Sequence, residues 1–482
     1  MHRPDGSAGA GPARAAREPA ARPVPSTRRQ LLRGAGAVAA VGAIGTGAVA
    51  ARRALPDAVD PRTVIPLWSG TVARDAEGGR VLVGGRAPDL PLDPGTRLAA
   101  ALPAGAPARE RAAAFAARTA PWRERLGRAP AAQAHEQGHG ADGSADGEDG
   151  AGEALRDLAD SALADLWVLS DDLPAPVAGW TRPWRYVWPR DAAFCAVALG
   201  RLGAVEQATS VLAHLGTLQA ADGWFEARYV PGTDRAPDRR LRQFDGTGLL
   251  LWACAETVDA AGGGDVAGAD VVDDRLAPLI TASLGALVRA TSGGTTLPPV
   301  SPDYWEVTES EVTLWLMAST LAGLRAGARL TGDAAVGTAA EAFAALLAGT
   351  FGRGGWQRYR AGGGADSALA LLDATGCHGM VPPARLLGLH SELARPAGGI
   401  APGAAWRQDG VSWTPSTSLL ALALARAGHC ERAAALLGWL AAHRTVEGSL
   451  PEKVLFDGRP AEVAPLAWTA ANVLLALDAL TG

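Results

Sequence analysis

Residues 189–220 read PRDAAFCAVALGRLGAVEQATSVLAHLGTLQA, and this stretch contains the pattern that decides the fold. On both sides of Gly203, apolar residues recur every three or four positions, as they do on one face of an α-helix. Proline suits the first turn of a helix, and glycine suits a break between two helices. The stretch therefore predicts two helices, at 190–202 and 203–220, joined by a tight turn into a helical hairpin.

The same spacing runs from Glu153 to the end of the chain, where alternating strand patterns are nearly absent. Twelve helices are predicted, at 153–170, 190–202, 203–220, 243–261, 273–292, 308–330, 333–351, 365–374, 383–395, 414–426, 428–443 and 464–480. Six such hairpins can bury their apolar faces in a solenoid or in a closed double ring. Because no fixed-period repeat is visible and long aromatic-rich loops separate some helices, we expect an all-α (α/α)6 toroid.

The chain before this helical domain, which spans 154–482, is predicted to have three parts: a signal at 1–50, an irregular packing region at 51–130 and an acidic low-complexity linker at 131–153. Short strands are expected near Val64–Leu67 and Arg80–Val83 in the packing region. The linker contains His135-Glu136-Gln137-Gly138-His139, which matches the HExxH pattern of zinc proteases. Neighbouring glycines break the helix that this motif needs, so we expect no metal there.

The first 50 residues contain Ser26-Thr27-Arg28-Arg29-Gln30-Leu31-Leu32, which closely resembles a twin-arginine export motif. A weakly apolar run and an Ala48-Val49-Ala50 cleavage pattern follow it. We expect a secreted or cell-surface protein without stable membrane insertion after cleavage, or alternatively an uncleaved anchor. Removal of residues 1–50, which carry a net charge of +5, would change the net charge from −5 to −10. An acidic protein is a poor partner for nucleic acid.

Tryptophan is unusually common, with 15 Trp against four Tyr and seven Phe, and several of the tryptophans lie in loops. Indole rings stack on the apolar faces of sugar rings and donate an N–H, so the loop positions favour a carbohydrate substrate over tryptophans that only fill the core. The segment Trp184-Arg185-Tyr186-Val187-Trp188-Pro189-Arg190-Asp191 adds a fork donor, Arg190, and an acceptor, Asp191, for sugar hydroxyls.

Two further segments supply carboxylates suited to acid/base chemistry. Glu306 follows Trp305 in Ser301-Pro302-Asp303-Tyr304-Trp305-Glu306, just before a helix that Thr308 and Glu311 are expected to cap. Partial burial beside the indole should raise the pKa of Glu306, as a general acid requires. Glu452 lies in the loop Gly448-Ser449-Leu450-Pro451-Glu452-Lys453, where Lys453 should keep it ionised as a general base. Two carboxylates on separate loops are what acid/base hydrolysis of a glycoside needs.

These segments, in this order, resemble glycoside hydrolase family 15, the glucoamylase-like family, over about residues 165–480. The resemblance lies in YVWPRDA (186–192), DYWE (303–306), GSLPE (448–452) and APLAWTAA (464–471). It implies an inverting, exo-acting enzyme that releases glucose from α-glucosides or α-glucans, with Glu306 as acid and Glu452 as base. It also implies that Arg190 and Asp191 bind the terminal glucose, and Gln243-Phe244-Asp245-Gly246 resembles a further substrate motif. Residues expected to bind substrate are Tyr186, Trp188, Arg190, Asp191, Asp245, Trp305 and Trp413.

Two positions depart from the family's pattern. Val307 stands where a second glutamate usually follows the acid, and Lys453 stands where glutamine often follows the base. Because the first departure concerns the leaving-group side, a trehalase of the same family remains an alternative, as does a non-catalytic sugar-binding toroid. No cofactor is expected. The sequence leaves the linkage, the chain length and the oligomeric state open.

Overall fold

The computed structural model describes residues 63–128, 145–262 and 266–481, all within the unit Asp57–Gly482. The export motif, its apolar run and the His135–His139 motif lie outside the described residues, as does most of the predicted linker. Between these gaps the chain is predominantly helical, and each of the twelve predicted helices is present. The prediction of an all-α toroid is therefore confirmed.

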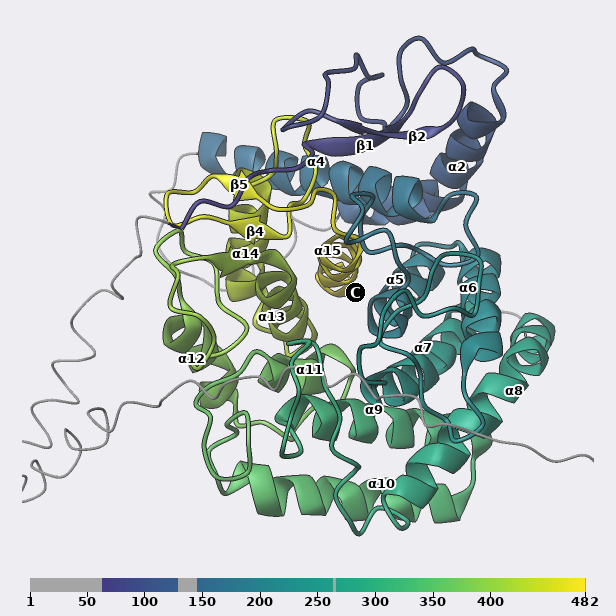
Figure 1. Ribbon diagram of the computed structural model, residues 1–482, viewed down its shortest axis with the longest axis vertical. Coiled ribbons are helices and arrows are strands. Elements are labelled where there is room, and N and C mark those ends of the chain that lie inside the picture. Colours follow the sequence, from purple (N-terminus) through teal and green to yellow (C-terminus); the bar gives the residue numbers. More distant parts are fainter. Residues whose placement is uncertain (1–62, 129–144, 263–265, 482) are drawn as a thin grey trace, which may run out of the picture. The chain divides into compact units, whose positions relative to one another are not determined.

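Six helices form an inner ring (Figure 1): α5 (Pro189–Arg201), α7 (Asp245–Ala261), α9 (Leu314–Thr331), α11 (Ala368–Ala374), α13 (Thr414–Arg426) and α15 (Ala467–Ala479). Each inner helix contacts the next, and α15 contacts α5, so the ring closes. These helices are buried nearly from end to end because their sequences are apolar or small on every side, as in AWTAANVLLALDA of α15.

Six more helices surround this ring: α4 (Ala145–Ser170), α6 (Val205–Leu218), α8 (Val266–Ala290), α10 (Ala334–Leu347), α12 (Pro383–Leu393) and α14 (Cys430–Ala442). They are amphipathic, and α6 and α14 bury only the residues on one stripe. The outer helix α10 continues into a π-helix, Ala348–Gly352. This continuous segment, Ala334–Gly352, is long and apolar enough to cross a membrane by composition, but here it packs on α9 as part of the double ring.

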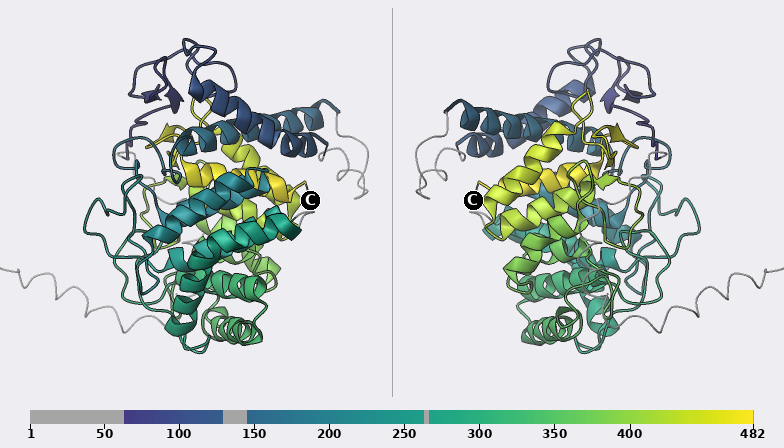
Figure 2. Two further views of the ribbon diagram at one scale, coloured as in Figure 1. Left: turned by 90° about the vertical axis from the view of Figure 1, so that its right-hand side faces the viewer. Right: turned by 90° about the vertical axis from the view of Figure 1, so that its left-hand side faces the viewer.

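The long loops gather at one end of the double ring, and α15 ends at the other (Figure 2). The loops lead into the N-termini of the inner helices. A small antiparallel sheet lies within them, formed by β3 (Ser412–Trp413), β4 (Lys453–Val454) and β5 (Pro460–Ala461) in that order. The ring thus brings segments that are far apart in sequence to one mouth.

The N-terminal packing region is more regular than predicted. Strands β1 (Thr71–Arg74) and β2 (Arg80–Val83) form an antiparallel hairpin, so the prediction for Arg80–Val83 is confirmed. The strand expected at Val64–Leu67 is wrong, because only a single bridge joins Leu67 to Glu462. Helix α4 begins at Ala145, inside the segment predicted as a linker.

A 22-residue helix, α2 (Pro107–Arg128), also lies in the region predicted to be irregular. Its sequence is polar and rich in arginine, and Pro121 lies inside it, so no clear helical pattern is visible. Its sparse apolar face is formed by Phe115, Trp122 and Leu126, which are buried. The Trp122 Nε1–H donates to Asp478 Oδ1 at the end of α15, at 3.1 Å. Tertiary packing therefore stabilises a helix that local propensity disfavours.

Close packing between inner helices yields the first prediction. A Cβ on Gly248 of α7 would lie 2.1 Å from the Ser319 carbonyl oxygen of α9, so Gly248→Ala must separate the two helices. We expect the free energy of unfolding to fall by about 1–3 kcal/mol, the usual cost of overpacking. The matched control is Gly337→Ala in α10, where a Cβ meets nothing within 4 Å. It should stabilise the helix by about 0.5–1 kcal/mol. Urea unfolding of both variants checks this, and equal effects would contradict the packing argument.

Candidate active site

The mouth of the ring holds the three segments that the sequence singled out. Arg190 and Asp191 lie in the first turn of α5, which begins at Pro189 as predicted. Glu306 lies in the loop before α9, and Glu452 lies at the edge of β4, in the segment before α15. The predicted Thr308–Glu311 cap is wrong, because α9 begins later and Thr313 is its N-cap, accepting from the Leu316 N–H at 3.3 Å.

Glu306 is held by side chains from three directions. Its Oε1 accepts from Arg190 Nη2 and from Gln243 Nε2, both at 2.9 Å. Its Oε2 accepts from Arg240 Nη1 at 2.8 Å. The residue adopts a left-handed backbone conformation, with φ of 56°, which is strained for a non-glycine residue. The loop thus uses an unfavourable conformation to bring this carboxylate to two arginines.

Arg190 is the centre of a buried charge cluster. Its guanidinium lies 3.1 Å from Asp245 Oδ2, and its Nε lies 3.4 Å from Asp191 Oδ2. The Trp315 indole donates to the same Asp245 oxygen at 2.8 Å. Burial and the neighbouring carboxylates Glu306 and Asp245 outweigh Arg190 and raise the pKa of Asp191 to about 7. The predicted residues Arg190, Asp191 and Asp245 therefore form one unit with Glu306.

Glu452 is held by a different set of residues. Its backbone N–H donates to the Val463 carbonyl, and its carbonyl accepts from the Thr414 N–H at the start of α13. Lys453 Nζ lies 3.4 Å from Glu452 Oε2 and 3.2 Å from Glu462 Oε2, so two carboxylates share its charge. The side chain of Glu452 is only 13% exposed, which leaves one face for a ligand.

The pKa shifts of these glutamates run opposite to expectation. Burial alone raises the pKa of Glu306, but Arg190, Gln243 and Arg240 together lower it below its usual value. For Glu452, burial raises the pKa, and Lys453 and a hydrogen bond from Trp184 offset this only in part. The sequence-based directions are wrong because the deciding partners of Glu306 lie far away in the chain, and because burial of Glu452 outweighs Lys453, whose charge Glu462 shares.

Aromatic rings join the two carboxylates. Trp305 packs edge-on against Trp406 at 4.9 Å between centroids, and Trp406 packs against Trp413 at 5.5 Å. Lys453 Nζ lies 4.5 Å from the Trp413 ring centroid. The indole nitrogens of these three tryptophans are buried and have no hydrogen-bond partner among the described residues. Unpaired buried donors are costly, so they indicate a surface that a ligand with acceptor groups completes.

More polar atoms without a hydrogen bond lie at the same mouth. Trp468 Nε1 is buried without a hydrogen-bond partner among the described residues, whereas Arg190 Nε, Asp191 Oδ2 and Glu452 Oε2 make ion-pair contacts at 3.4 Å but no hydrogen bond. Below them, Trp315 and Trp468 lie 5.8 Å apart, and Phe194 lies 5.8 Å from Trp468. This aromatic layer fills the centre of the inner ring.

The other predicted aromatic residues form one wall of the mouth. Tyr186 and Trp188 pack edge-on at 6.2 Å, and Arg228 lies over both rings, 4.5 Å from the first and 5.0 Å from the second. Together with Trp184 they cover Val463 and Leu466. Each residue predicted to bind substrate thus lies at the mouth.

The sequence analysis missed Arg240, Glu462 and Trp468 as parts of the site. Arg240 lies in an arginine-rich loop that reads as solvated surface, and Glu462 reads as an ordinary polar residue. Trp468 lies inside the segment APLAWTAA (464–471), whose resemblance to the family could have pointed to Trp468 as a site residue. Among the described residues, no group of three or more His, Cys, Asp or Glu side chains could hold a metal ion.

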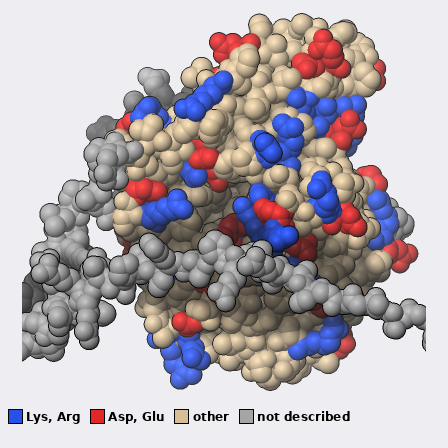
Figure 3. Space-filling model, viewed as in Figure 1, with Lys and Arg blue, Asp and Glu red and all other residues tan. Residues whose placement is uncertain are grey.

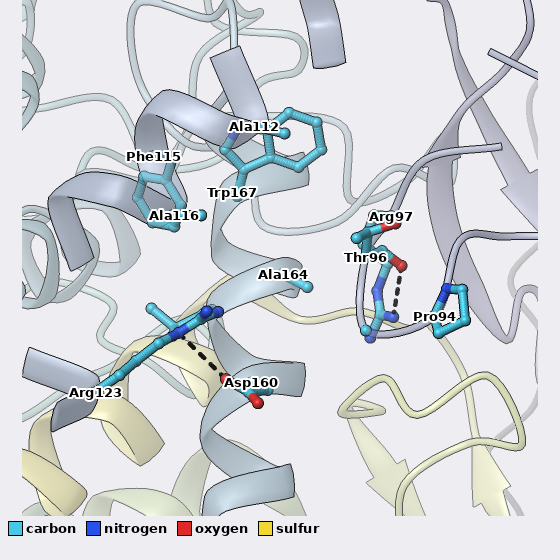
Figure 4. A pocket seen from close by; sticks show the side chains of 12 residues that line it. Pro94, Thr96, Arg97, Ala112, Phe115, Ala116, Arg123, Asp160, Ala164 and Trp167 are labelled. Atoms are coloured by element: carbon cyan, nitrogen blue, oxygen red, sulfur yellow. Dashed lines mark hydrogen bonds and ion pairs between the residues drawn. The ribbon is translucent and has the colours of Figure 1, made fainter. Parts of the chain in front are cut away.

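A cavity of about 340 Å³ lies away from the mouth, between the 94–97 loop and helices α2 and α4 (Figure 4). Phe115 and Trp167 line it, and Arg123 points toward Asp160 across it, at 3.2 Å. Asp160 is the one carboxylate among its twelve lining residues. This cavity therefore lacks the two carboxylates that acid/base hydrolysis of a glycoside needs.

The fold is similar to that of solved glycosidases. A glycosidase variant in complex with glucose matches 68% of this chain and 98% of its own, with a TM-score of 0.56 and 21% identity. A glucoamylase from Saccharomycopsis fibuligera matches 68% of this chain and 94% of its own, with a TM-score of 0.50 and 13% identity. A bacterial glucoamylase complexed with acarbose matches 67% of this chain and 55% of its own, with a TM-score of 0.50 and 15% identity.

At the level of sequence, no family model matches the chain, and no curated protein matches it. Identities of 13–22% to solved structures establish the fold.

The opposite pKa shifts predict opposite stability effects. The lowered pKa of Glu306 means that its ionised form stabilises the folded state above the usual value of 4.5, and that this stabilisation is lost as the pH falls through the lowered pKa. Glu306→Gln should therefore be less stable than wild type at pH 7, by a margin that shrinks towards pH 3. The raised pKa of Glu452 means that stability is lost as the pH rises through it. Glu452→Gln should be more stable at pH 7, again with a margin that shrinks in acid. Thermal unfolding across this range measures both, and shifts of the same sign would refute the assignment.

Proposed function

We propose that the chain is an inverting, exo-acting glycoside hydrolase of the glucoamylase-like family 15. It releases glucose from α-glucosides or α-glucans, with Glu306 as general acid and Glu452 as general base. The observation that carries this proposal is the pair of half-buried carboxylates on separate loops of one mouth, beside indole N–H groups that have no hydrogen-bond partner among the described residues. Two carboxylates flanking a glycosidic bond are the machinery of glycoside hydrolysis.

The charges at the mouth suit a neutral, hydroxyl-rich ligand. Arg190 Nε and Asp191 Oδ2 make only a 3.4 Å ion-pair contact with each other and no hydrogen bond, so a donor and an acceptor lie side by side. The free indole N–H groups of Trp305, Trp406 and Trp413 add donors and apolar ring surface. On the face shown in Figure 3, basic and acidic side chains are intermixed, which favours a neutral sugar over a highly charged substrate. A glucosyl unit satisfies these groups together.

The aromatic layer at the centre of the ring supports attack at chain ends. Because the aromatic layer of Phe194, Trp315 and Trp468 fills the centre of the ring, a polysaccharide cannot thread through it. A terminal glucose can enter with its leaving group pointing outward. In the reaction, Glu452 takes a proton from water, the water oxygen bonds to the anomeric carbon, and Glu306 gives its proton to the departing oxygen. The products are β-glucose and the shortened alcohol.

The raised pKa of Glu452 fits the role of base. A carboxylate with a raised pKa is a stronger base than an ordinary one, and Lys453 and Trp184 still favour its ionised form. Glu306 must be protonated to act as acid, whereas two arginines favour its ionised form in the ligand-free site. The acid role therefore requires substrate binding to change the surroundings of Glu306.

Export through the twin-arginine motif at Ser26–Leu32 belongs to the same proposal. A secreted or cell-surface enzyme meets α-glucans and oligosaccharides outside the cell. The expected binding partner of this protein is therefore a carbohydrate.

Glu306→Gln and Glu452→Gln should each lower kcat by about 10²–10⁴-fold on the best α-glucoside, the usual contribution of a general acid or base. Maltose, isomaltose and trehalose at equal concentration identify that substrate, and preference for trehalose would point to the trehalase alternative. Glu431→Gln, on the exposed first turn of α14, is the control and should retain full activity.

Proton NMR of the released sugar should show β-glucose first, followed by mutarotation. If α-glucose accumulates first, inversion is excluded. If the wild type binds these sugars but hydrolyses none of them, the toroid is a non-catalytic sugar-binding protein.

A further inference from the structure

The two oxygens of Glu306 face different surroundings. Oε1 accepts from Arg190 in α5 and from Gln243, which the backbone ties to Phe225, and both donors are only 4% exposed. Oε2 accepts from Arg240, whose side chain is 41% exposed and belongs to the loop before α7. The inner oxygen is therefore fixed by the fold, and the outer oxygen is covered by one side chain that solvent reaches.

Arg240 is held in place by a chain of contacts rather than lying free on the surface. Its Nε lies 3.3 Å from Asp238 Oδ2, and Asp238 also pairs with Arg228 at 2.5 Å. Arg228 in turn lies over the rings of Tyr186 and Trp188 and donates to the Pro183 carbonyl. These contacts anchor the loop to the same wall of the mouth that the substrate would touch.

A general acid must reach the oxygen that it protonates within hydrogen-bond distance. Because Oε1 of Glu306 is locked by buried partners, the glycosidic oxygen must approach Oε2, where Arg240 now lies. The Arg240 guanidinium must then withdraw, and the atoms nearest to it become those of the leaving group. The neighbouring Val307 is 40% exposed and apolar, so it offers the leaving group no hydrogen bond from its side chain.

Building on the proposed function, we propose that Arg240 determines specificity for the leaving group: when substrate binds, it exchanges Glu306 for hydroxyl oxygens of the group that departs. A guanidinium presents N–H groups in a planar fork, which suits the neighbouring hydroxyls of a sugar or polyol. The substrate class is then α-glucosides whose leaving group is itself a sugar or polyol, in preference to leaving groups without hydroxyls.

The exchange also provides the protonated acid. The charged groups facing Glu306 are Arg190 and Asp191 from α5, Asp245 from α7 and Arg240 from the loop. Withdrawal of Arg240 leaves one arginine facing three carboxylates, including Glu306 itself. The pKa of Glu306 then rises as the substrate enters, which is the direction that its role requires.

The experiment compares Arg240→Gln with wild type on two substrates, maltose and α-glucosyl fluoride. The first has a sugar leaving group, and the second has a fluoride leaving group without hydroxyls. We expect kcat/KM on maltose to fall about 10- to 100-fold, the effect of losing hydrogen bonds from a charged group. On α-glucosyl fluoride it should change less than about threefold. Arg242→Gln is the matched control, because Arg242 lies on the same loop but pairs with Asp222 at 2.6 Å.

Each outcome decides the inference. A selective loss on maltose, with both substrates unaffected in Arg242→Gln, supports it. An equal loss on both substrates would mean that Arg240 supports Glu306 or the loop without contacting the leaving group. No loss on either substrate would mean that Arg240 contributes nothing to the reaction. Both outcomes overturn the inference and leave the proposed function intact. If the wild type hydrolyses neither substrate, the proposed function fails, and the inference fails with it.

Discussion

A buried guanidinium organises the mouth of this double ring. Arg190 is only 4% exposed, and it must find anions because an unpaired buried charge is strongly destabilising. Asp191 from its own helix, Asp245 from α7 and Glu306 from the loop before α9 supply them. One interaction thus fixes the start of two inner helices and the position of the proposed acid. Removing any one carboxylate would disturb the others, because they share the same cation.

A second buried charge, that of Asp165, holds the loop that carries Glu452 in place. Asp165 in α4 is fully buried, and it accepts from the Ser449 hydroxyl at 2.6 Å and from the Leu450 N–H at 3.0 Å. Arg97, from the N-terminal region, pairs with the same carboxylate at 2.8 Å. The loop that carries Glu452 is therefore tied to an outer helix and to residues before the ring. The N-terminal region is part of the framework of the site and not an appendage to it.

The sequence predicted the ring well and the site's electrostatics poorly, for physical reasons. Helical periodicity is a local signal, so all twelve helices could be recognised from it, whereas α2 escaped because its apolar face is sparse and Pro121 interrupts its pattern. Motif order predicted that Glu306 and Arg190 belong to one site, and the two side chains lie 2.9 Å apart. The pKa shift of Glu306 depends on Arg190, 116 residues away, and on Arg240, 66 residues away. No local pattern specifies contacts over such separations.

The surroundings of Glu306 and Glu452 shift the pKa values of the two carboxylates in different ways. Glu306 depends on Arg190 of α5, on Gln243 just before α7 and on one exposed loop arginine, so its charge state can respond to what enters the mouth. Glu452 depends on burial and on a lysine that Glu462 shares, and none of these groups lies on an exposed loop side chain. A site built this way keeps its base poised in advance and completes its acid only when a ligand displaces Arg240. Glu306 and Glu452 can keep opposite pKa shifts within one site because they do not share their main cation. Arg190 pairs with Glu306, and Lys453 pairs with Glu452.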